Sequence, residues 1–396
     1  MPIIELQFDG FHKVKSLFTS SEHLDFTIEA AIAGNSPMRV WVDREASPRS
    51  AFLWDTAHCY YFGGTAGNRE FCEAVENILK NTLIPTAIDK NREIFKIESS
   101  STEWEPILEK ILENTPPFKV LRKFLALDTL LVPQWKGLLP SGFQIRRIDR
   151  KLLESDIVNL QAIIDEIDQC WHSVDDFLAN GFGFCLVYTP EDKKEEVQGW
   201  CTGEYFSVGK CGIGIETFYR YRKRGFATAM ASAFVEHCLS VNIQPHWDAS
   251  ANNEASLRVA KKVGFNEIQK YSVFLGTFTN IETFKGDHYY QEKDFTRAAK
   301  WYEKAAELNQ RTFYNYYNAA CSWALIGENN CAFDCLTKAL NNWEDPSVRF
   351  IHHMKTDADL VNLHSTEGWK TFLQRINAIE KIKTDKETKS VEQNAT

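Results

Sequence analysis

The stretch Ile215-Glu-Thr-Phe-Tyr-Arg-Tyr-Arg-Lys-Arg-Gly-Phe-Ala-Thr228 decides the fold. A predicted strand runs into a basic loop, and a helix rich in small residues begins at Gly225. Backbone N–H groups at the start of a helix have no intrahelical acceptor, and the helix dipole makes that end partly positive. The stretch therefore predicts a phosphate-binding loop. Two other interpretations stay open, a solvated basic turn and a basic cluster for nucleic acid or nuclear import.

The residues on either side of this stretch predict an α/β fold in which strands and helices follow one another along the chain. Alternating apolar residues predict the strands, and apolar residues three and four apart predict the helices. The predicted strands cover residues 143–148, 184–188, 197–207, 210–217, 243–249 and 270–277. After the first strand and the helical pieces predicted at 152–167 and 171–178, the order is three strands, a helix, a strand, a helix and a last strand.

Two motifs in this block resemble those of the GNAT acetyltransferase superfamily. The pattern Arg222-x-x-Gly225-x-Ala227 is similar to the superfamily's pyrophosphate loop. Downstream, Asn253 precedes a predicted helix that ends in Gly264-Phe265, as in a later motif of the superfamily. The resemblance covers residues 140–277 and implies a mixed, mostly antiparallel sheet flanked by helices. It implies an enzyme that transfers acetyl from acetyl-CoA, as a co-substrate, to an amine by direct attack in a ternary complex.

The same resemblance implies which residues hold the co-substrate. The strand before the loop splays from its neighbour, and its backbone pairs with the pantetheine arm. The loop and the first turn of the helix bind the pyrophosphate, and Asn253 meets the arm. The implied binding residues are Thr217, Phe218, Tyr219, Arg222, Lys223, Arg224, Gly225, Phe226, Ala227, Thr228 and Asn253.

Acetyl transfer needs a base to take a proton from the amine, and a carboxylate or histidine serves this role in many enzymes. Glu216 on the splayed strand is the first candidate, and Glu204 on the adjacent strand is the second. His246 and Asp248 form the third candidate. Purely structural roles stay open for each, such as a hydrogen bond in the strand gap for Glu216 and a core position for His246.

One departure from the superfamily concerns the general acid. Many members place a tyrosine on the helix after the asparagine, where this chain has Ala260. Tyr271 lies on the following predicted strand, and Ser256 and water are further sources of a proton. The acid stays unassigned, and a non-catalytic acyl-CoA binder stays open as an alternative function.

A closer likeness extends to the N-terminal half. Pro48-Arg-Ser-Ala-Phe-Leu-Trp54, Ile213-Gly-Ile-Glu-Thr217 and Pro245-His-Trp-Asp248 resemble a bacterial branch of the superfamily that includes the zwittermicin A resistance acetyltransferase. That likeness implies a small-molecule acceptor, such as an amino-bearing antibiotic. It also implies that the N-terminal half is a degenerate second GNAT-like unit.

The chain divides into four predicted parts. They are an α/β domain at 1–135, a GNAT-like domain at 140–278, an all-α tetratricopeptide-like domain at 281–380 and a disordered tail at 383–396. The tetratricopeptide prediction rests on a 34-residue period, in which Ala298 and Ala305 recur as Ala332 and Ala339. Such a region favours a protein partner or self-association, and it keeps a protein N-acetyltransferase or a scaffold open as alternatives.

Composition narrows the partners and the location. Lys and Arg total 45 against 54 Asp and Glu, so the net charge of −9 disfavours nucleic acid and anionic membranes. No apolar run approaches the roughly 20 residues of a membrane span, and the start lacks the pattern of a signal peptide. We therefore expect a cytoplasmic protein whose ten cysteines are reduced and which binds no metal.

Overall fold

The computed structural model describes residues 3–19, 22–90, 92–191, 194–343 and 348–393. The chain forms two compact units, Met1–Gly276 and Thr277–Thr396. Within the described residues, no helix is both long enough and apolar enough to cross a membrane.

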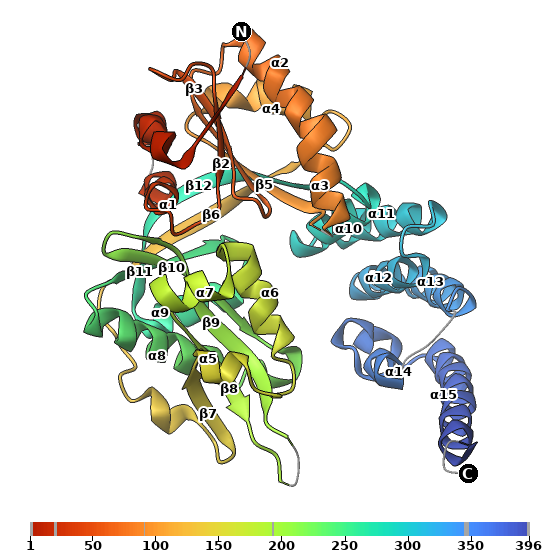
Figure 1. The fold of residues 1–396 in the computed structure, drawn as a ribbon. Coiled ribbons are helices and arrows are strands. Elements are labelled where there is room, and N and C mark those ends of the chain that lie inside the picture. The colour runs from red at the N-terminus through yellow and green to blue at the C-terminus, as the bar shows by residue number, and fades with distance from the viewer. Residues whose placement is uncertain (1–2, 20–21, 91, 192–193, 344–347, 394–396) are drawn as a thin grey trace. The chain divides into compact units, whose positions relative to one another are not determined.

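A single sheet of twelve strands, counted over the described residues, forms the centre of the first unit (Figure 1). The strands are β1 (Ile4–Leu6), β2 (Arg39–Val42), β3 (Ser50–Trp54), β4 (Cys59–Gly64), β5 (Ile94–Ser99), β6 (Phe118–Leu127), β7 (Phe143–Arg147), β8 (Gly183–Tyr188), β9 (Glu196–Ser207), β10 (Lys210–Thr217), β11 (Gln244–Ser250) and β12 (Phe265–Thr277). Their spatial order is β1-β2-β3-β4-β5-β12-β6-β11-β10-β9-β8-β7. The sheet is mixed, because β4 pairs with β5 and β10 with β11 in parallel, whereas the other described pairs are antiparallel.

Helices connect the strands of this unit. The α-helices are α1 (Glu22–Ile32), α2 (Arg69–Ile78), α3 (Ile84–Asp89), α4 (Glu105–Ile111), α5 (Arg150–Leu153), α6 (Gln161–Cys170), α7 (Val174–Asn180), α8 (Phe226–Ser240) and α9 (Glu254–Val263). The 3-10 helices are η1 (Phe8–Leu17), η3 (Thr102–Trp104), η4 (Trp135–Leu138) and η5 (Tyr219–Tyr221), and η2 (Leu79–Leu83) is a π-helical segment between α2 and α3. Helix α8 buries Met230, Phe234 and Cys238 in the largest apolar cluster, which fixes its N-terminus beside the end of β10.

The two halves of this unit have the same order of elements. Each begins with a strand and helical segments, continues with three antiparallel strands and a helix, and closes with a parallel strand, a helix and a last strand. The last strands are exchanged between the halves. Strand β6 of the N-terminal half pairs with β11, and β12 of the C-terminal half lies between β6 and β5 (Figure 1). The predicted domains 1–135 and 140–278 therefore share one continuous sheet.

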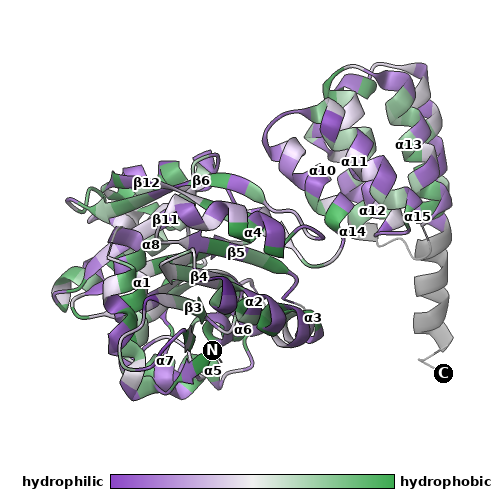
Figure 2. Cartoon of the chain, turned by 90° about the horizontal axis from the view of Figure 1, so that it is seen from above, coloured by the Kyte–Doolittle hydropathy of each residue, from purple (hydrophilic) through white to green (hydrophobic). Residues whose placement is uncertain are grey.

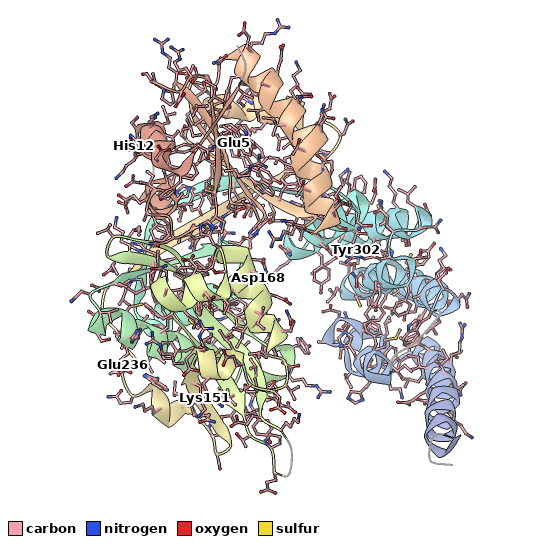
Figure 3. The ribbon with its side chains drawn as sticks, in the orientation of Figure 1. Glu5, His12, Lys151, Asp168, Glu236 and Tyr302 are labelled. Carbon is pink, nitrogen blue, oxygen red and sulfur yellow. The ribbon has the colours of Figure 1, made fainter. Side chains whose placement is uncertain are left out.

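The second unit is helical. It consists of α10 (Ile281–Gln291), α11 (Phe295–Glu307), α12 (Thr312–Leu325), α13 (Asn329–Asn341), α14 (Val348–Thr356), η6 (Ala358–Leu363) and α15 (Glu367–Gln393). In Figure 2, α11 and α13 carry both hydrophilic and hydrophobic residues, as amphipathic helices do. Tyr302, labelled in Figure 3, is buried and donates a hydrogen bond to Asp287 at 2.7 Å.

The disordered tail predicted at 383–396 stays a prediction, and the bounds of α15 extend to Gln393. Residues 394–396 lie outside the described residues.

Candidate active site

Strands β10 and β11 are hydrogen-bonded only at their first residues and then diverge. They pair in parallel over only three residues, Lys210–Gly212 with Gln244–His246. Beyond that point β10 continues to Thr217 beside β9, and β11 continues to Ser250 beside β6. The backbone groups on the inner edge of β10 therefore face an opening, where an extended ligand can hydrogen-bond to them.

The loop after β10 presents backbone amides at the start of α8. Gly225 has φ of 86° and Lys223 has φ of 61°, so both adopt the left-handed conformation. The Ala229 amide donates to the Gly225 carbonyl at 3.1 Å. The first-turn amides of Phe226 to Thr228 precede this bond and have no acceptor within the helix. Together with the helix dipole, they form a cradle for a phosphate group.

The side chains of this loop contact the protein itself. Arg222 donates from Nε to the carbonyl of Thr217 at 2.8 Å, and its Nη2 lies 3.7 Å from Glu216. The guanidinium of Arg224 lies over the rings of Phe143 and Phe226, at 5.4 and 5.2 Å from their centroids. These contacts fix the conformation of the loop. Because both guanidinium groups are engaged with the protein, a bound anion would be held mainly by the backbone amides of the loop.

The other predicted co-substrate residues lie around the same opening. Thr217 ends β10, and the Phe218 amide donates to the carbonyl of Gln198 at 2.9 Å. Tyr219 is exposed on η5. Asn253 caps α9 by accepting from the Ser256 amide at 3.0 Å.

A cavity of about 440 Å³ adjoins the opening between β10 and β11. Both halves of the first unit line it. The N-terminal half supplies His23, Phe26, Thr27, Asp55, His58, Tyr61, Lys96, Glu98, Arg122 and Phe124. The C-terminal half supplies Glu166, Gln169, Cys170, Trp200, Glu204, Tyr205, Gly212, Ile213, Gly214, Ile215, His246, Trp247, Asp248, Ala249, Ser250, Asn253, Ser256 and Tyr271.

The predicted base candidates differ in their relation to this cavity. The side chain of Glu216 is 47% exposed, pairs with Arg222 and is not among the cavity residues. His246 lines the cavity, stacks on Phe124 with centroids 5.1 Å apart, and is buried. Burial, together with the charge of Lys210, lowers the pKa of His246 to about 4, so the ring is neutral at neutral pH.

Glu204 lies inside the cavity and faces Gly214 across the two strands. A Cβ on Gly214 would lie 1.9 Å from Oε1 of Glu204. Only glycine at this position leaves room for the carboxyl group against the β10 backbone, where the opening begins. Burial raises the pKa of Glu204 above its ordinary value.

A β-bulge in β9 directs the side chains of both Glu204 and Tyr205 into the cavity. The register with β10 changes between Lys210 and Gly212, where β9 carries one extra residue. Tyr205 there has φ of 48°, an uncommon conformation for an aromatic residue. Successive residues of a regular strand point to opposite faces, yet Glu204 and Tyr205 both line the cavity. Backbone strain of this kind gathers at functional sites.

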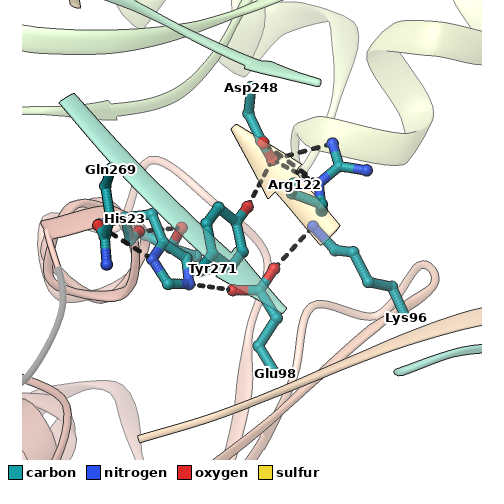
Figure 4. Close-up of polar contacts among 8 residues, drawn as sticks. His23, Lys96, Glu98, Arg122, Asp248, Gln269 and Tyr271 are labelled. Atoms are coloured by element: carbon teal, nitrogen blue, oxygen red, sulfur yellow. Dashed lines mark hydrogen bonds and ion pairs between the residues drawn. The ribbon is translucent and has the colours of Figure 1, made fainter. Parts of the chain in front are cut away.

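Asp248 belongs to a second charged group in the cavity wall, shown in Figure 4. It accepts from Arg122 Nη2 at 3.0 Å and from the Tyr271 hydroxyl at 2.8 Å. Beside it, Glu98 lies 2.8 Å from both Lys96 Nζ and His23 Nε2 (Figure 4). Burial alone would raise the pKa of Glu98, but Lys96 and His23 outweigh it and lower that pKa.

Part of the cavity wall was not predicted as functional from the sequence. Glu166 of α6 is the main example, because its carboxyl group lies beside that of Glu204. A signal existed in the helical spacing. Ile163, Ile167 and Cys170 place Glu166 on the apolar side of α6, where an ionised carboxylate is costly without a function. For the N-terminal half, no comparable signal linked residues so distant in sequence to this site.

The general acid is not evident from the contacts near Asn253. Ala260 is fully buried in α9. Ser256 lines the cavity, and its hydroxyl accepts from Trp247 Nε1 at 2.9 Å. Tyr271 directs its hydroxyl to Asp248.

The opened sheet, the amide cradle at α8 and the adjoining cavity together form the candidate active site of the first unit. A family model for GNAT acetyltransferases matches residues 15–274, about two thirds of the chain. The chain therefore belongs to the GNAT acetyltransferase family and is an acetyltransferase. Members of this family use acetyl-CoA as co-substrate.

Two relatives agree with this assignment. The uncharacterized N-acetyltransferase YdfB of Bacillus subtilis (strain 168) is 25% identical over 272 residues, which cover 68% of this chain and 97% of the relative. The crystal structure of a GCN5-related N-acetyltransferase-like protein from Streptococcus suis 89/1591 has a TM-score of 0.51 at 20% identity. That similarity covers 68% of this chain and 98% of the other, and it concerns the fold.

Proposed function

We propose that the protein transfers acetyl from acetyl-CoA to the amine of a small molecule bound in the cavity, with Glu204 as the base. The observation that carries this proposal is the place of the Glu204 carboxyl group. It lies against Gly214, at the edge of β10 that turns away from β11. The thioester would lie in this opening, with the pyrophosphate on the amides of the α8 N-terminus.

The proposed reaction requires two things of the protein, binding of the diphosphate and removal of a proton from the amine. The loop from Arg222 to Gly225 and the first turn of α8 bind the diphosphate. Glu204 removes a proton from the amine, directly or through water, so that the nitrogen can attack the thioester carbonyl. The raised pKa of Glu204 brings its basicity closer to that of the amine than an exposed glutamate would allow.

The size and walls of the cavity support a small-molecule acceptor over a protein amine. A volume of about 440 Å³ falls within the range of small-molecule sites, about 300–1,000 Å³. The cavity is lined by residues from both halves of the first unit, so a folded protein surface would find little room. The likeness to the branch of the zwittermicin A resistance acetyltransferase agrees with this acceptor class.

We also propose that the N-terminal half is a degenerate second GNAT-like unit. The repeated order of elements and the exchange of β6 and β12 support it. The N-terminal half differs from the C-terminal half at the pair of parallel strands, because it has no opening between them. Strands β4 and β5 stay paired over Cys59–Phe62 and Lys96–Ser99, and the helix that follows β4 is capped by the Asn68 side chain. We therefore assign no co-substrate site to this half; its residues form one wall of the acceptor cavity.

For the second unit we propose a tetratricopeptide-like role in docking a protein partner or a second copy. Its support is the 34-residue spacing of Ala298 and Ala305 in α11 with Ala332 and Ala339 in α13, all of which are buried. A Cβ on Gly286 would lie 2.5 Å from the Tyr302 ring, so α10 and α11 pack closely there.

The test is release of free CoA from acetyl-CoA, measured with a thiol reagent across a panel of primary alkylamines, diamines and amino sugars. We expect amine-dependent release by the native protein and a loss of at least about 100-fold in kcat for Glu204→Gln, the size typical of a general base. Folded native protein that binds acetyl-CoA but releases none with any amine would refute the proposed acceptor class. Native kcat in Glu204→Gln would remove Glu204 from the mechanism.

A further inference from the structure

Two carboxyl groups from different elements meet inside the cavity. Glu166 comes from α6 and Glu204 from β9, and each directs Oε1 at the bare backbone of Gly214. A Cβ at that glycine would lie 2.9 Å from the first oxygen and 1.9 Å from the second. Carboxylate oxygens of both residues and Sγ of Cys170 lie within 4.8 Å of one another. The Cys170 thiol donates to Glu166 at 3.8 Å.

The cations nearby are engaged elsewhere. Lys96 lies against Glu98, and Arg122 against Asp248. In the part of the chain that the structure describes, neither Glu166 nor Glu204 forms an ion pair with a lysine, arginine or histidine. Burying two adjacent carboxylates without a counter-charge is costly, so a pair of this kind retains a proton.

The electrostatics agree with that geometry. Burial, and then the charge of Glu204, raise the pKa of Glu166 to about 9. The titratable groups around the pair come from five elements: Cys170 from α6, Tyr205 from β9, Asp55 and His58 from the turn between β3 and β4, Lys96 from β5 and Asp248 from β11. Asp55 and Asp248 add negative charge to this end of the cavity, and His58 is exposed to water.

We propose that Glu166 and Glu204 act as one carboxyl pair, which binds the ammonium group of the acceptor and takes one proton from it. This proposal rests on the proposed function and narrows its substrates to cationic primary amines. At neutral pH the pair holds one proton and one negative charge. An ammonium ion is the ligand that neutralises it inside the cavity.

The proposed reaction accounts for every proton and electron pair that moves. The ammonium nitrogen gives one proton to the pair, whose two carboxyl groups are then both neutral. The freed amine attacks the thioester carbonyl, the C–N bond forms, the C–S bond breaks, and the electron pair of that bond goes to the CoA sulfur. The second proton of the nitrogen passes to that sulfur, and the pair returns its extra proton to water near His58.

The first experiment needs no substrate. Infrared spectroscopy at pH 7.5 detects the C=O stretch of protonated carboxyl groups in the native protein, Glu166→Gln and Glu204→Gln. We expect a protonated-carboxyl band in the native protein that both variants lose. The matched control is Asp165→Asn, because Asp165 is exposed on the same helix and accepts from Gln161. This control should keep the band. A band of native intensity in both Gln variants would overturn the carboxyl pair.

The second experiment asks whether the pair selects a cation. Butylamine is cationic at pH 7.5 and aniline is neutral, and both are primary amines. We expect Glu166→Gln to lower kcat/KM for butylamine about tenfold or more, chiefly through KM, since a hydrogen bond to a charged group is lost. The loss for aniline should be much smaller, and Glu166→Asp should recover part of the butylamine activity. Equal losses for the two amines would overturn the role of Glu166 in cation binding.

The two proposals can fail separately. If the native protein released no CoA with any amine, the proposed function would fail, while the infrared band would still decide whether the pair holds a proton. If amine-dependent release were normal in Glu166→Gln for both probes, the carboxyl-pair proposal would fail and the acetyltransferase function would stand.

Discussion

Replacing Gly214 with alanine tests the geometry on which the candidate active site depends. The added Cβ would lie 1.9 Å from Oε1 of Glu204, whereas non-bonded heavy atoms settle at about 3.5 Å. The carboxyl group must therefore retreat by about 1.5 Å from the opening between β10 and β11. A misplacement of about 1 Å at a catalytic group can cost about 100-fold in rate. We expect kcat to fall about 100-fold, equivalent to about 2.7 kcal/mol of transition-state stabilisation.

The cost of this substitution should fall on catalysis and not on folding. The displaced atoms are the ends of two flexible side chains, so the free energy of unfolding should change by less than about 1 kcal/mol. The assay pairs amine-dependent CoA release with urea unfolding. Gly212→Ala is the matched comparison on the same face of β10, because its Cβ would meet the Glu204 backbone oxygen at 3.3 Å and Phe26 at 3.6 Å. We expect a much smaller loss of kcat there.

Two results would refute this reasoning. Native kcat in Gly214→Ala would mean that the place of the Glu204 carboxyl group over β10 does not matter for the reaction. Equal losses in Gly214→Ala and Gly212→Ala would mean that any side chain on this face blocks the site, whatever happens to the carboxyl group.

Three further predictions concern the co-substrate site, the carboxyl pair and the division of the chain. Gly225→Glu places an anion in the amide cradle at a residue with φ of 86°, so acetyl-CoA binding measured by calorimetry should weaken at least about 100-fold, while circular dichroism stays native. The raised pKa of Glu166 means that the folded chain binds more protons than the unfolded chain between pH 4.5 and about 9. The free energy of unfolding should therefore fall as pH rises through this window, and Glu166→Gln should reduce that fall; parallel pH curves of the two proteins would contradict it. A fragment of residues 1–277, which ends with β12, should fold and bind acetyl-CoA like the full chain, because the first compact unit contains the whole candidate site; an unfolded fragment would show that the second unit is needed for stability.

The strand, loop and helix start of the candidate co-substrate site could be predicted from the sequence because they are local features. A strand, a basic loop, Gly225 and the first turn of α8 are contiguous, and backbone amides at a helix start bind anions without help from distant residues. The strands of the C-terminal half were also predicted within one residue at their ends, because their apolar alternation is clear, except that β12 begins at Phe265 and was predicted only from residue 270. The family model over residues 15–274 agrees with the resemblance drawn from these motifs.

The strand β6 could not be predicted from local sequence patterns. Phe118–Leu127 was not predicted as a strand, yet it pairs with both β11 and β12. Pairing of this kind depends on residues more than 100 positions away, so it leaves no local signal. The consequence is large, since Arg122 on β6 brings the N-terminal half into contact with Asp248 on β11.

The sequence by itself indicated the family, which the family model shows, and it predicted a phosphate-binding loop and a short set of base candidates, since each depends on residues close together in the chain. Only the tertiary structure shows where those candidates lie. The bulge at Tyr205 and the bare backbone of Gly214 place Glu204 in the cavity, and the packing of α6 brings Glu166 beside it. Glu216 is on the expected strand but points to Arg222 at the surface. The physical reason is that the pKa and reach of a carboxyl group depend on the groups packed around it, and distant parts of the chain supply those groups.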